Sequence, residues 1–174
     1  TSDSAPKKIS RSNFLGAAMP QTCVAWEQTP AGDSAGDSTT NTTHTRALNN
    51  LSDPSGIASL ADSKITLQAG TYYVSASAPG YYCGDHVLWL HDDTTSDSSA
   101  EILVQGSAQH ADDSSDDNDR CYLMGIFTIT VASDIVLKHR AETGRTDGLG
   151  RPFSQIGSLA LPNVYSMITI TKIS

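Results

Sequence analysis

Alternation with a period of two residues constrains the fold of this chain more than any other feature of its sequence. Apolar and polar residues alternate in 64–67 and again in 71–78, and Ala69-Gly70 lies between the two runs. Side chains of a β-strand point alternately to its two faces, so each run predicts a strand with one buried face. The glycine between them predicts a tight turn, and we therefore expect 64–79 to form a β-hairpin.

The same alternation returns along most of the remaining chain. The other segments with a strand pattern are 23–28, 85–92, 101–108, 120–131, 134–140 and 164–173. Loops rich in Gly, Ser and Asp separate them, and no segment has a helical period over a convincing length. About eight to ten short strands at this spacing predict an all-β fold, either a sandwich or a barrel.

The chain of 174 residues is long enough for one domain with a short tail. We expect an irregular N-terminal arm at 1–20 and a single β-domain at 21–174. The arm contains the basic residues Lys7, Lys8 and Arg11, followed by Phe14. It is interpreted either as a frayed terminus or as a tether that contacts a partner.

Charge and hydropathy exclude several classes of function. The net charge is −8, ten of the 19 acidic residues lie between Asp85 and Asp119, and no Lys or Arg occurs between Lys64 and Arg120. Nucleic-acid binders need a basic surface, so nucleic acid is not expected as a partner. No apolar run reaches the roughly 20 residues that span a bilayer, so no membrane partner is expected. The start of the chain lacks the apolar core of a signal peptide, which favours synthesis in the cytoplasm as a complete gene product.

Three cysteines, Cys23, Cys83 and Cys121, occur without a CxxC spacing. An odd number in a chain without a secretory signal predicts reduced, buried or half-buried thiols. A disulfide between Cys83 and Cys121 stays open, because the sequence does not show whether their strands are neighbours.

Two groups of residues are candidate metal ligands. His86 and His91 are five residues apart on one predicted strand, so they point to opposite faces and are interpreted as hydrogen-bonded strand histidines. A second group could offer oxygens to Ca²⁺ but lacks the glycine and distal glutamate of an EF-hand, and a solvated acidic loop is the favoured interpretation. This group consists of Asp112, Asp113, Asp116, Asp117 and Asp119. No cofactor is expected.

A polar cluster is predicted around the turn at 148–150. Its members are His139, Arg140, Glu142, Arg145 and Asp147. The favoured interpretation is an ion-pair network at a subunit interface, and the alternative is a pocket in which arginines bind a sugar or an acid. The chain contains no G-x-S-x-G, no H-E-x-x-H and no acidic dyad, so no catalytic residues are predicted and an enzyme is not expected.

Several segments in order carry a family resemblance. They are ITLQAGTYYVSASAP, HVLWLHD, the strand at 120–130, LKHRAETGRTDGLG and VYSMITITKI. Over about Cys23 to Ile173 they resemble a β-jelly-roll domain of bacteriophage virion proteins, which is similar in shape to the C1q and tumour-necrosis-factor (TNF) group. The chain departs from that pattern in its acidic 112–119 loop and in Leu161-Pro162-Asn163 before the last strand.

The resemblance implies a jelly-roll sandwich that assembles as a homotrimer on the virion surface. Such domains decorate and cement capsids by binding the major capsid protein or another virion protein, or they form tail-fibre and spike tips that contact host glycans. The absence of a shaft or heptad repeat in the sequence favours capsid decoration, with the receptor-binding tip as the alternative. A C1q-like or lectin-like binding module is the third interpretation.

Overall fold

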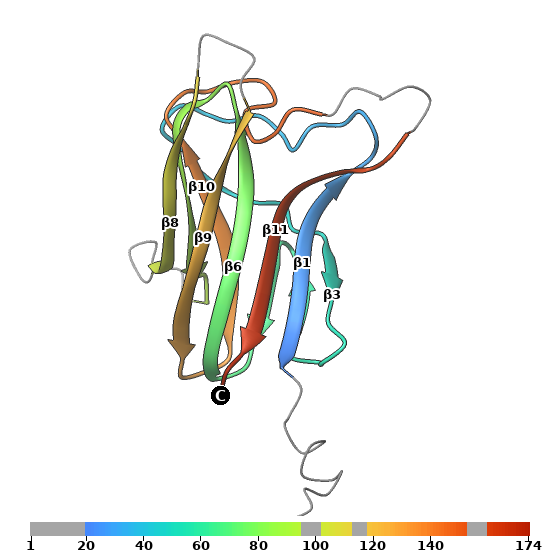
Figure 1. The fold of residues 1–174 in the computed structure, drawn as a ribbon, viewed down its shortest axis with the longest axis vertical. Helices are drawn as coiled ribbons and strands as arrows, with labels where there is room; N and C mark the ends of the chain where they lie inside the picture. Colours follow the sequence, from blue (N-terminus) through green and yellow to red (C-terminus); the bar gives the residue numbers. More distant parts are fainter. Residues whose placement is uncertain (1–19, 95–101, 113–117, 153–159) are drawn as a thin grey trace, which may run out of the picture.

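In the described part of the chain, eleven strands form two antiparallel sheets that pack face to face (Figure 1). The structure is a computed structural model, and it describes residues 20–94, 102–112, 118–152 and 160–174. The five-stranded sheet has the order β3 (Asn50–Ser52), β1 (Gln21–Thr29), β11 (Asn163–Lys172), β6 (Gly70–Tyr81) and β9 (Asn118–Ile129). The six-stranded sheet has the order β4 (Ala58–Ala61), β5 (Lys64–Leu67), β10 (Ser133–Ala141), β7 (Gly84–Asp92) and β8 (Ile102–Ala111), with β2 (Thr43–Thr45) paired to β10.

The hairpin expected at 64–79 is wrong, because its two strands belong to different sheets. β5 pairs with β4 and β10, whereas β6 pairs with β11 and β9. The chain crosses from one sheet to the other at Gln68-Ala69, and the Tyr72 hydroxyl donates to the Gln68 carbonyl at 2.7 Å across this corner. Alternation shows which residues face the core, and both strands face the same core from opposite sides, so the pattern could not show which strands pair.

A true hairpin lies just before this corner and joins β4 to β5. Ala61 pairs with Lys64, and the two residues between them, Asp62 and Ser63, have φ angles of 50° and 64°. Positive φ at both central residues is the property of a type I′ turn, whose twist matches that of the strands. The Asp-Ser pair lacks the glycine that usually marks this turn.

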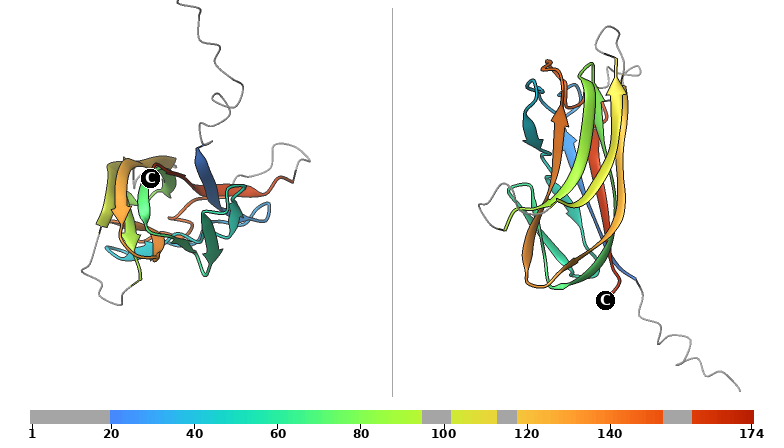
Figure 2. Two further views of the ribbon diagram at one scale, coloured as in Figure 1. Left: turned by 90° about the horizontal axis from the view of Figure 1, so that it is seen from below. Right: turned by 90° about the vertical axis from the view of Figure 1, so that its left-hand side faces the viewer.

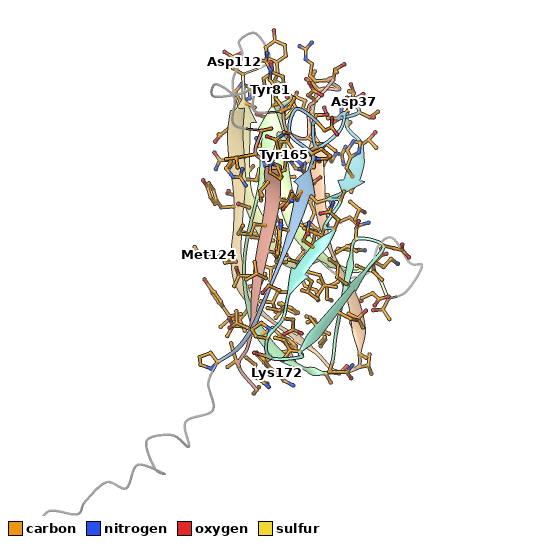
Figure 3. All side chains as sticks on the ribbon, turned by 90° about the vertical axis from the view of Figure 1, so that its right-hand side faces the viewer. Asp37, Tyr81, Asp112, Met124, Tyr165 and Lys172 are labelled. Carbon is orange, nitrogen blue, oxygen red and sulfur yellow. The ribbon has the colours of Figure 1, made fainter. Side chains whose placement is uncertain are left out.

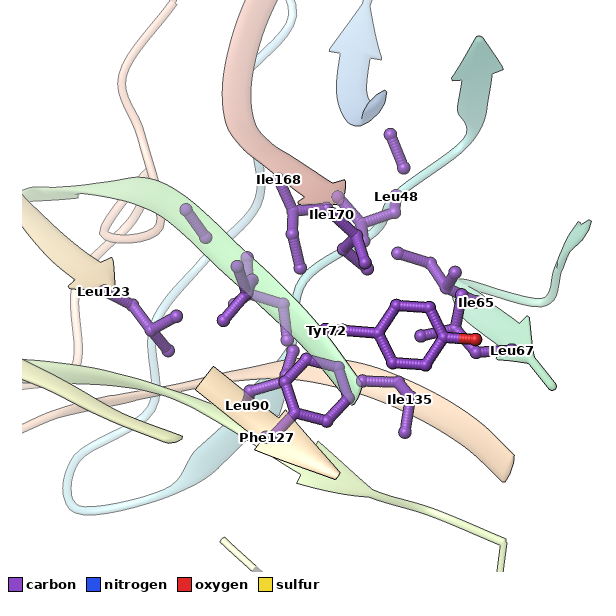
Figure 4. Close-up of a cluster of buried hydrophobic side chains, with 14 of the residues drawn as sticks. Leu48, Ile65, Leu67, Tyr72, Leu90, Leu123, Phe127, Ile135, Ile168 and Ile170 are labelled. Atoms are coloured by element: carbon purple, nitrogen blue, oxygen red, sulfur yellow. The ribbon is translucent and has the colours of Figure 1, made fainter. Parts of the chain in front are cut away.

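The buried faces agree with the alternation. Tyr72 and Val74 of β6 have no exposed surface, and neither do Leu88 and Leu90 of β7. Figure 4 shows the centre of this core, where the rings of Tyr72 and Phe127 stack with centroids 5.5 Å apart. Each large apolar side chain removed from water in this way stabilises the fold by roughly 1.5–3 kcal/mol.

The two ends of the sandwich differ. At one end, called here the terminal end, Gln21 of β1 pairs with Lys172 of β11 near the C-terminus (Figure 1). At the other, called the loop end, the segments 34–39, 81–84 and 142–150 meet. Figure 2 shows the two sheets running between these ends. The described residues contain no helix that is long and apolar enough to cross a membrane.

Candidate functional site

The core becomes polar toward the loop end. Six side chains meet there, from both sheets and from the segment between β2 and β3, and each has 2% or less of its surface exposed. They are Glu27, Arg46, His86, Cys121, His139 and Ser166. Buried polar groups persist only when they are hydrogen-bonded, so the contacts of this set decide what it does. We call it the buried polar network.

Arg46 is the centre of the buried polar network. Its Nε and Nη2 donate to Oε2 of Glu27 at 3.0 and 2.6 Å, and its Nη1 donates to the carbonyl of Leu149 at 2.7 Å. The Ser166 hydroxyl donates to the same glutamate oxygen at 2.8 Å. Arg46 therefore connects the five-stranded sheet to the loop at 142–150, and Glu27 neutralises its charge inside the core.

The two histidines extend the buried polar network in a fixed direction. Arg46 Nη1 lies 3.3 Å from Nδ1 of His139, and Nε2 of His139 lies 3.0 Å from Nδ1 of His86. A guanidinium can only donate, so Nδ1 of His139 accepts and its ring proton resides on Nε2. That proton is donated to His86 Nδ1, which leaves the His86 proton on Nε2, the atom without a hydrogen-bond partner among the described residues.

Burial and the neighbouring cation keep both imidazoles neutral. Burial, followed by the charge of Arg46, holds the pKa of His139 well below its ordinary value. Burial also lowers the pKa of His86, although Asp119 and Asp85 oppose this shift. A neutral histidine pair is consistent with the direction of donation, since each ring acts once as a donor or acceptor toward the other.

Three metal-binding atoms converge in the network. His86, His139 and Cys121 each offer one ligand atom, a ring nitrogen or Sγ, and these atoms all lie within 4.8 Å of one another. A histidine that binds a metal through one nitrogen normally donates its other N–H to a carboxylate, a carbonyl or water. The other nitrogen of His139 faces the donor Arg46, and that of His86 faces no acceptor. The arrangement suits a chain of hydrogen bonds better than a metal.

Cys121 and His86 also resemble a thiol–imidazole pair, with Sγ 3.1 Å from Nδ1. A nucleophilic cysteine needs access to substrate and a lowered pKa. Cys121 has no exposed surface, and burial raises its pKa to about 12. The pair is therefore unsuited to nucleophilic chemistry in this conformation.

The polar cluster expected around 148–150 is dispersed in the structure. His139 is in the buried polar network, whereas Arg140 is exposed on the opposite face of β10. Arg145 stacks on the ring of Tyr82 at 4.4 Å, and the amide of Asp147 donates to Asp37 at 2.9 Å.

Arg140 and Glu142 nonetheless share one surface feature. They line a shallow groove of about 320 Å³, together with Asn41 and Asp85. Oε2 of Glu142 accepts the Asp85 amide at 3.2 Å, so this carboxylate supports the strand that forms the groove.

The remaining candidate residues fall partly outside the described part of the chain. This applies to the arm residues Lys7, Lys8, Arg11 and Phe14 and to Asp113, Asp116 and Asp117 of the acidic loop. Asp112 and Asp119 are described, and one oxygen of Asp119 accepts the Arg120 amide at 2.7 Å. All three cysteines are buried and free, so Cys83 and Cys121 are not joined by a disulfide.

An apolar stripe crosses the outer face of the five-stranded sheet. Tyr122, Met124 and Ile126 of β9 are 57%, 68% and 64% exposed. The strand register continues the stripe across the sheet. On β9 Tyr122 pairs with Ser77 of β6, which pairs with Met167 of β11, and Met167 in turn pairs with Trp26 of β1. Figure 3 shows Met124 projecting from the sandwich. We define the apolar stripe as Trp26, Tyr73, Tyr122, Met124, Ile126 and Met167.

Solved structures share this arrangement. The chain superposes on murine APRIL with a TM-score of 0.55 at 11% identity, covering 89% of this chain and 100% of that one. It superposes on the globular domain of zebrafish complement 1qA with a TM-score of 0.54 at 11% identity, covering 90% and 98%. The chain has the C1q/TNF-like jelly-roll fold.

A third structure with this jelly-roll fold is the Eiger TNF from S. frugiperda, with a TM-score of 0.53 at 12% identity, covering 89% of this chain and 93% of that one. No family model and no curated protein matches the sequence. The C1q/TNF-like fold expected from the sequence is thus confirmed.

Sequence reasoning missed Glu27, Arg46 and the pairing of His86 with His139. One signal was present: Glu27 shares the alternation of buried Cys23 and Ala25. A charged residue on a buried face predicts a buried partner. The identity of that partner depends on which strands face each other, which alternation does not contain.

Proposed function

We propose that this chain is a non-enzymatic module that assembles as a homotrimer through the apolar stripe and presents its loop end to a partner. The stripe carries the proposal. Large contiguous apolar patches are rare on monomeric proteins and mark interaction sites. The nearby polar residues Ser75, Ser77 and Thr169 are small, so a second copy can pack closely against the sheet.

The C1q/TNF-like fold supports a self-associating binding module more than an enzyme. Within the described residues, the one thiol–imidazole pair that the network forms is fully buried, and its thiol is protonated at neutral pH. The observations therefore favour a surface that binds over a pocket that reacts.

Light scattering coupled to gel filtration tests the assembly. The wild-type chain is expected to elute with three times the chain mass. Charges placed on the stripe by Met124→Lys with Ile126→Lys should give a folded monomer, because buried unpaired charges are strongly unfavourable. Val131→Lys is the matched control, since Val131 is 63% exposed in the turn after β9 and lies off the stripe. A monomeric wild type, or an unchanged double variant, would contradict the proposal.

We further propose that the trimer decorates and cements a phage capsid. The support is the sequence resemblance to virion jelly rolls and the basic arm at 1–20, which precedes β1 at the terminal end. Because β1 begins at the terminal end, the segment before it joins the sandwich away from the loop end, which stays free for a partner.

Deleting residues 1–12 separates this role from trimer formation. Cosedimentation with purified capsids of the encoding phage should be lost, while light scattering still gives a trimer. Lys7→Ala, Lys8→Ala and Arg11→Ala together form the finer variant, which tests the arm charges alone. Unchanged capsid binding would refute decoration without affecting the trimer. Adsorption of the isolated trimer to host cells, with inhibition of infection, would instead identify a receptor-binding tip.

A further inference from the structure

The buried polar network has a property that neither trimer formation nor capsid binding requires. We propose that the hydrogen-bonded series Arg46–His139–His86 is an acid-sensitive latch. It holds the loop at 142–150 on the sandwich and releases the loop when a histidine takes up a proton. The inference does not depend on the proposed function, because the latch lies inside one subunit.

The geometry gives a new proton no free site inside the chain of hydrogen bonds. The lone pair of His139 Nδ1 accepts from Arg46, and the lone pair of His86 Nδ1 accepts from His139. A proton on His139 would therefore place two donors 3.3 Å apart, and a proton on His86 would do the same at 3.0 Å. Protonation must break the chain at one of these contacts.

Charge opposes the proton as well. The histidines lie in the core beside a guanidinium whose buried carboxylate partner, Glu27, already accepts hydrogen bonds from Arg46 and Ser166. A second cation would be buried without a counter-ion, which is strongly unfavourable. The charges that act on the histidine pair are those of His44, Arg46, Asp85, His110 and Asp119. The groups that act on Arg46 and Cys121 beside the pair are Glu27, Cys83, Arg120 and Tyr165.

We expect the hydrogen bond between Arg46 and the Leu149 carbonyl of the loop to break on protonation. Arg46 holds Glu27 through two donors, but it holds the loop only through Nη1, which is shared between the Leu149 carbonyl and His139. The Leu149 amide in turn donates to Gly36 at 3.1 Å, and Tyr81 donates to Gly148 at 3.1 Å. Moving Nη1 away therefore loosens all three segments of the loop end, while the apolar core near the terminal end stays closed.

The sign of the pH dependence follows from the two states. In the open state the histidines titrate near the ordinary imidazole pKa, whereas in the closed state their pKa values are lower. The open state therefore binds more protons as the pH falls below about 6.5. The opening equilibrium should increase roughly tenfold per pH unit for each histidine that is protonated on opening.

Amide hydrogen exchange of the full chain tests the latch at about pH 7 and about pH 5. After correction for intrinsic exchange, protection of the Leu149 amide should fall at least roughly tenfold at the lower pH. Amides of β6 near Tyr72 should keep their protection. Equal protection of the Leu149 amide at both pH values would overturn the proposal.

Variants identify the groups responsible. Glutamine can accept from Arg46 and donate onward without titrating, so His86→Gln with His139→Gln should remove the acid response. His110→Gln is the control, because His110 is exposed and contacts Asp85 at 2.7 Å outside the hydrogen bonds of the latch, and the response should remain. An acid response that survives the double variant would refute the latch. If that variant does not fold, NMR titration of wild-type imidazoles decides: ordinary titration of both rings with the loop still protected would also refute it.

Discussion

Arg46 is the residue on which the interior of this jelly roll depends most. It has no exposed surface. Its three guanidinium nitrogens contact Glu27 of β1, His139 of β10 and Leu149 of the loop at 142–150. A buried ion pair contributes little net stability compared with apolar residues of the same size, but the loss of one partner is costly. Arg46 thus specifies which loop and which strand meet, rather than adding much stability itself.

Replacement of Arg46 tests this role. Arg46→Ala leaves the carboxylate of Glu27 buried without a counter-ion and should lower the free energy of unfolding by about 3–5 kcal/mol in urea denaturation at fixed protein concentration. Glu27→Met combined with Arg46→Met should recover most of that loss, because no charge then remains in the core. Arg140→Ala, at an exposed position on β10, should change stability by less than about 0.5 kcal/mol. A small effect of Arg46→Ala would contradict the central place of this side chain.

At the scale of elements, the sequence predicted what faces the core better than what pairs with what. The buried side chains of β6, β7, β9 and β10 follow the alternation, and even His139 shares its face with Ile135 and Leu137. Pairing was harder, because β5 and β6 are consecutive yet lie in opposite sheets. Alternation with a period of two does not show which strands are neighbours in a sheet. The corner at Gln68-Ala69 could therefore not be predicted, and neither could the buried polar network, whose residues come from distant strands.

Gly106 shows how two edge strands close one side of the sandwich. β8 belongs to the six-stranded sheet and β9 to the five-stranded sheet, and Ser107 Oγ lies 3.3 Å from both the amide and the carbonyl of Tyr122. A Cβ on Gly106 would lie 2.6 Å from the Tyr122 carbonyl oxygen and 2.7 Å from that of Leu88. Both neighbours are backbone atoms and cannot move aside as a side chain could.

Gly106→Ala should therefore destabilise the protein by about 1–3 kcal/mol, measured as a lower urea midpoint with an unchanged slope. Gln105→Ala, at the exposed neighbouring position on β8, is the matched control and should stay within about 0.5 kcal/mol. Equal midpoints for the two variants would show that the β8–β9 closure tolerates the extra methyl group, contrary to the close contacts.

At the scale of the whole molecule, the two ends and the outer face have separate properties. The terminal end brings Gln21 and Lys172 together. The loop end lies above the buried polar network, and the apolar stripe covers the face between the ends. The sequence resemblance predicted the fold and trimer formation. The stripe residues could be recognised only after register placed Tyr122 and Met167 in one row, on either side of Ser77.

The proposed trimer would make stability depend on protein concentration. If folded subunits are stabilised by association, the melting temperature of the wild type should rise over about a hundredfold increase in concentration, by mass action. The Met124→Lys and Ile126→Lys double variant should melt at one temperature throughout, and below the wild type. Scanning calorimetry at both concentrations makes the comparison, with Val131→Lys expected to behave like the wild type. A wild-type melting temperature that does not change with concentration would mean that the apolar stripe adds no stability through contact with other copies.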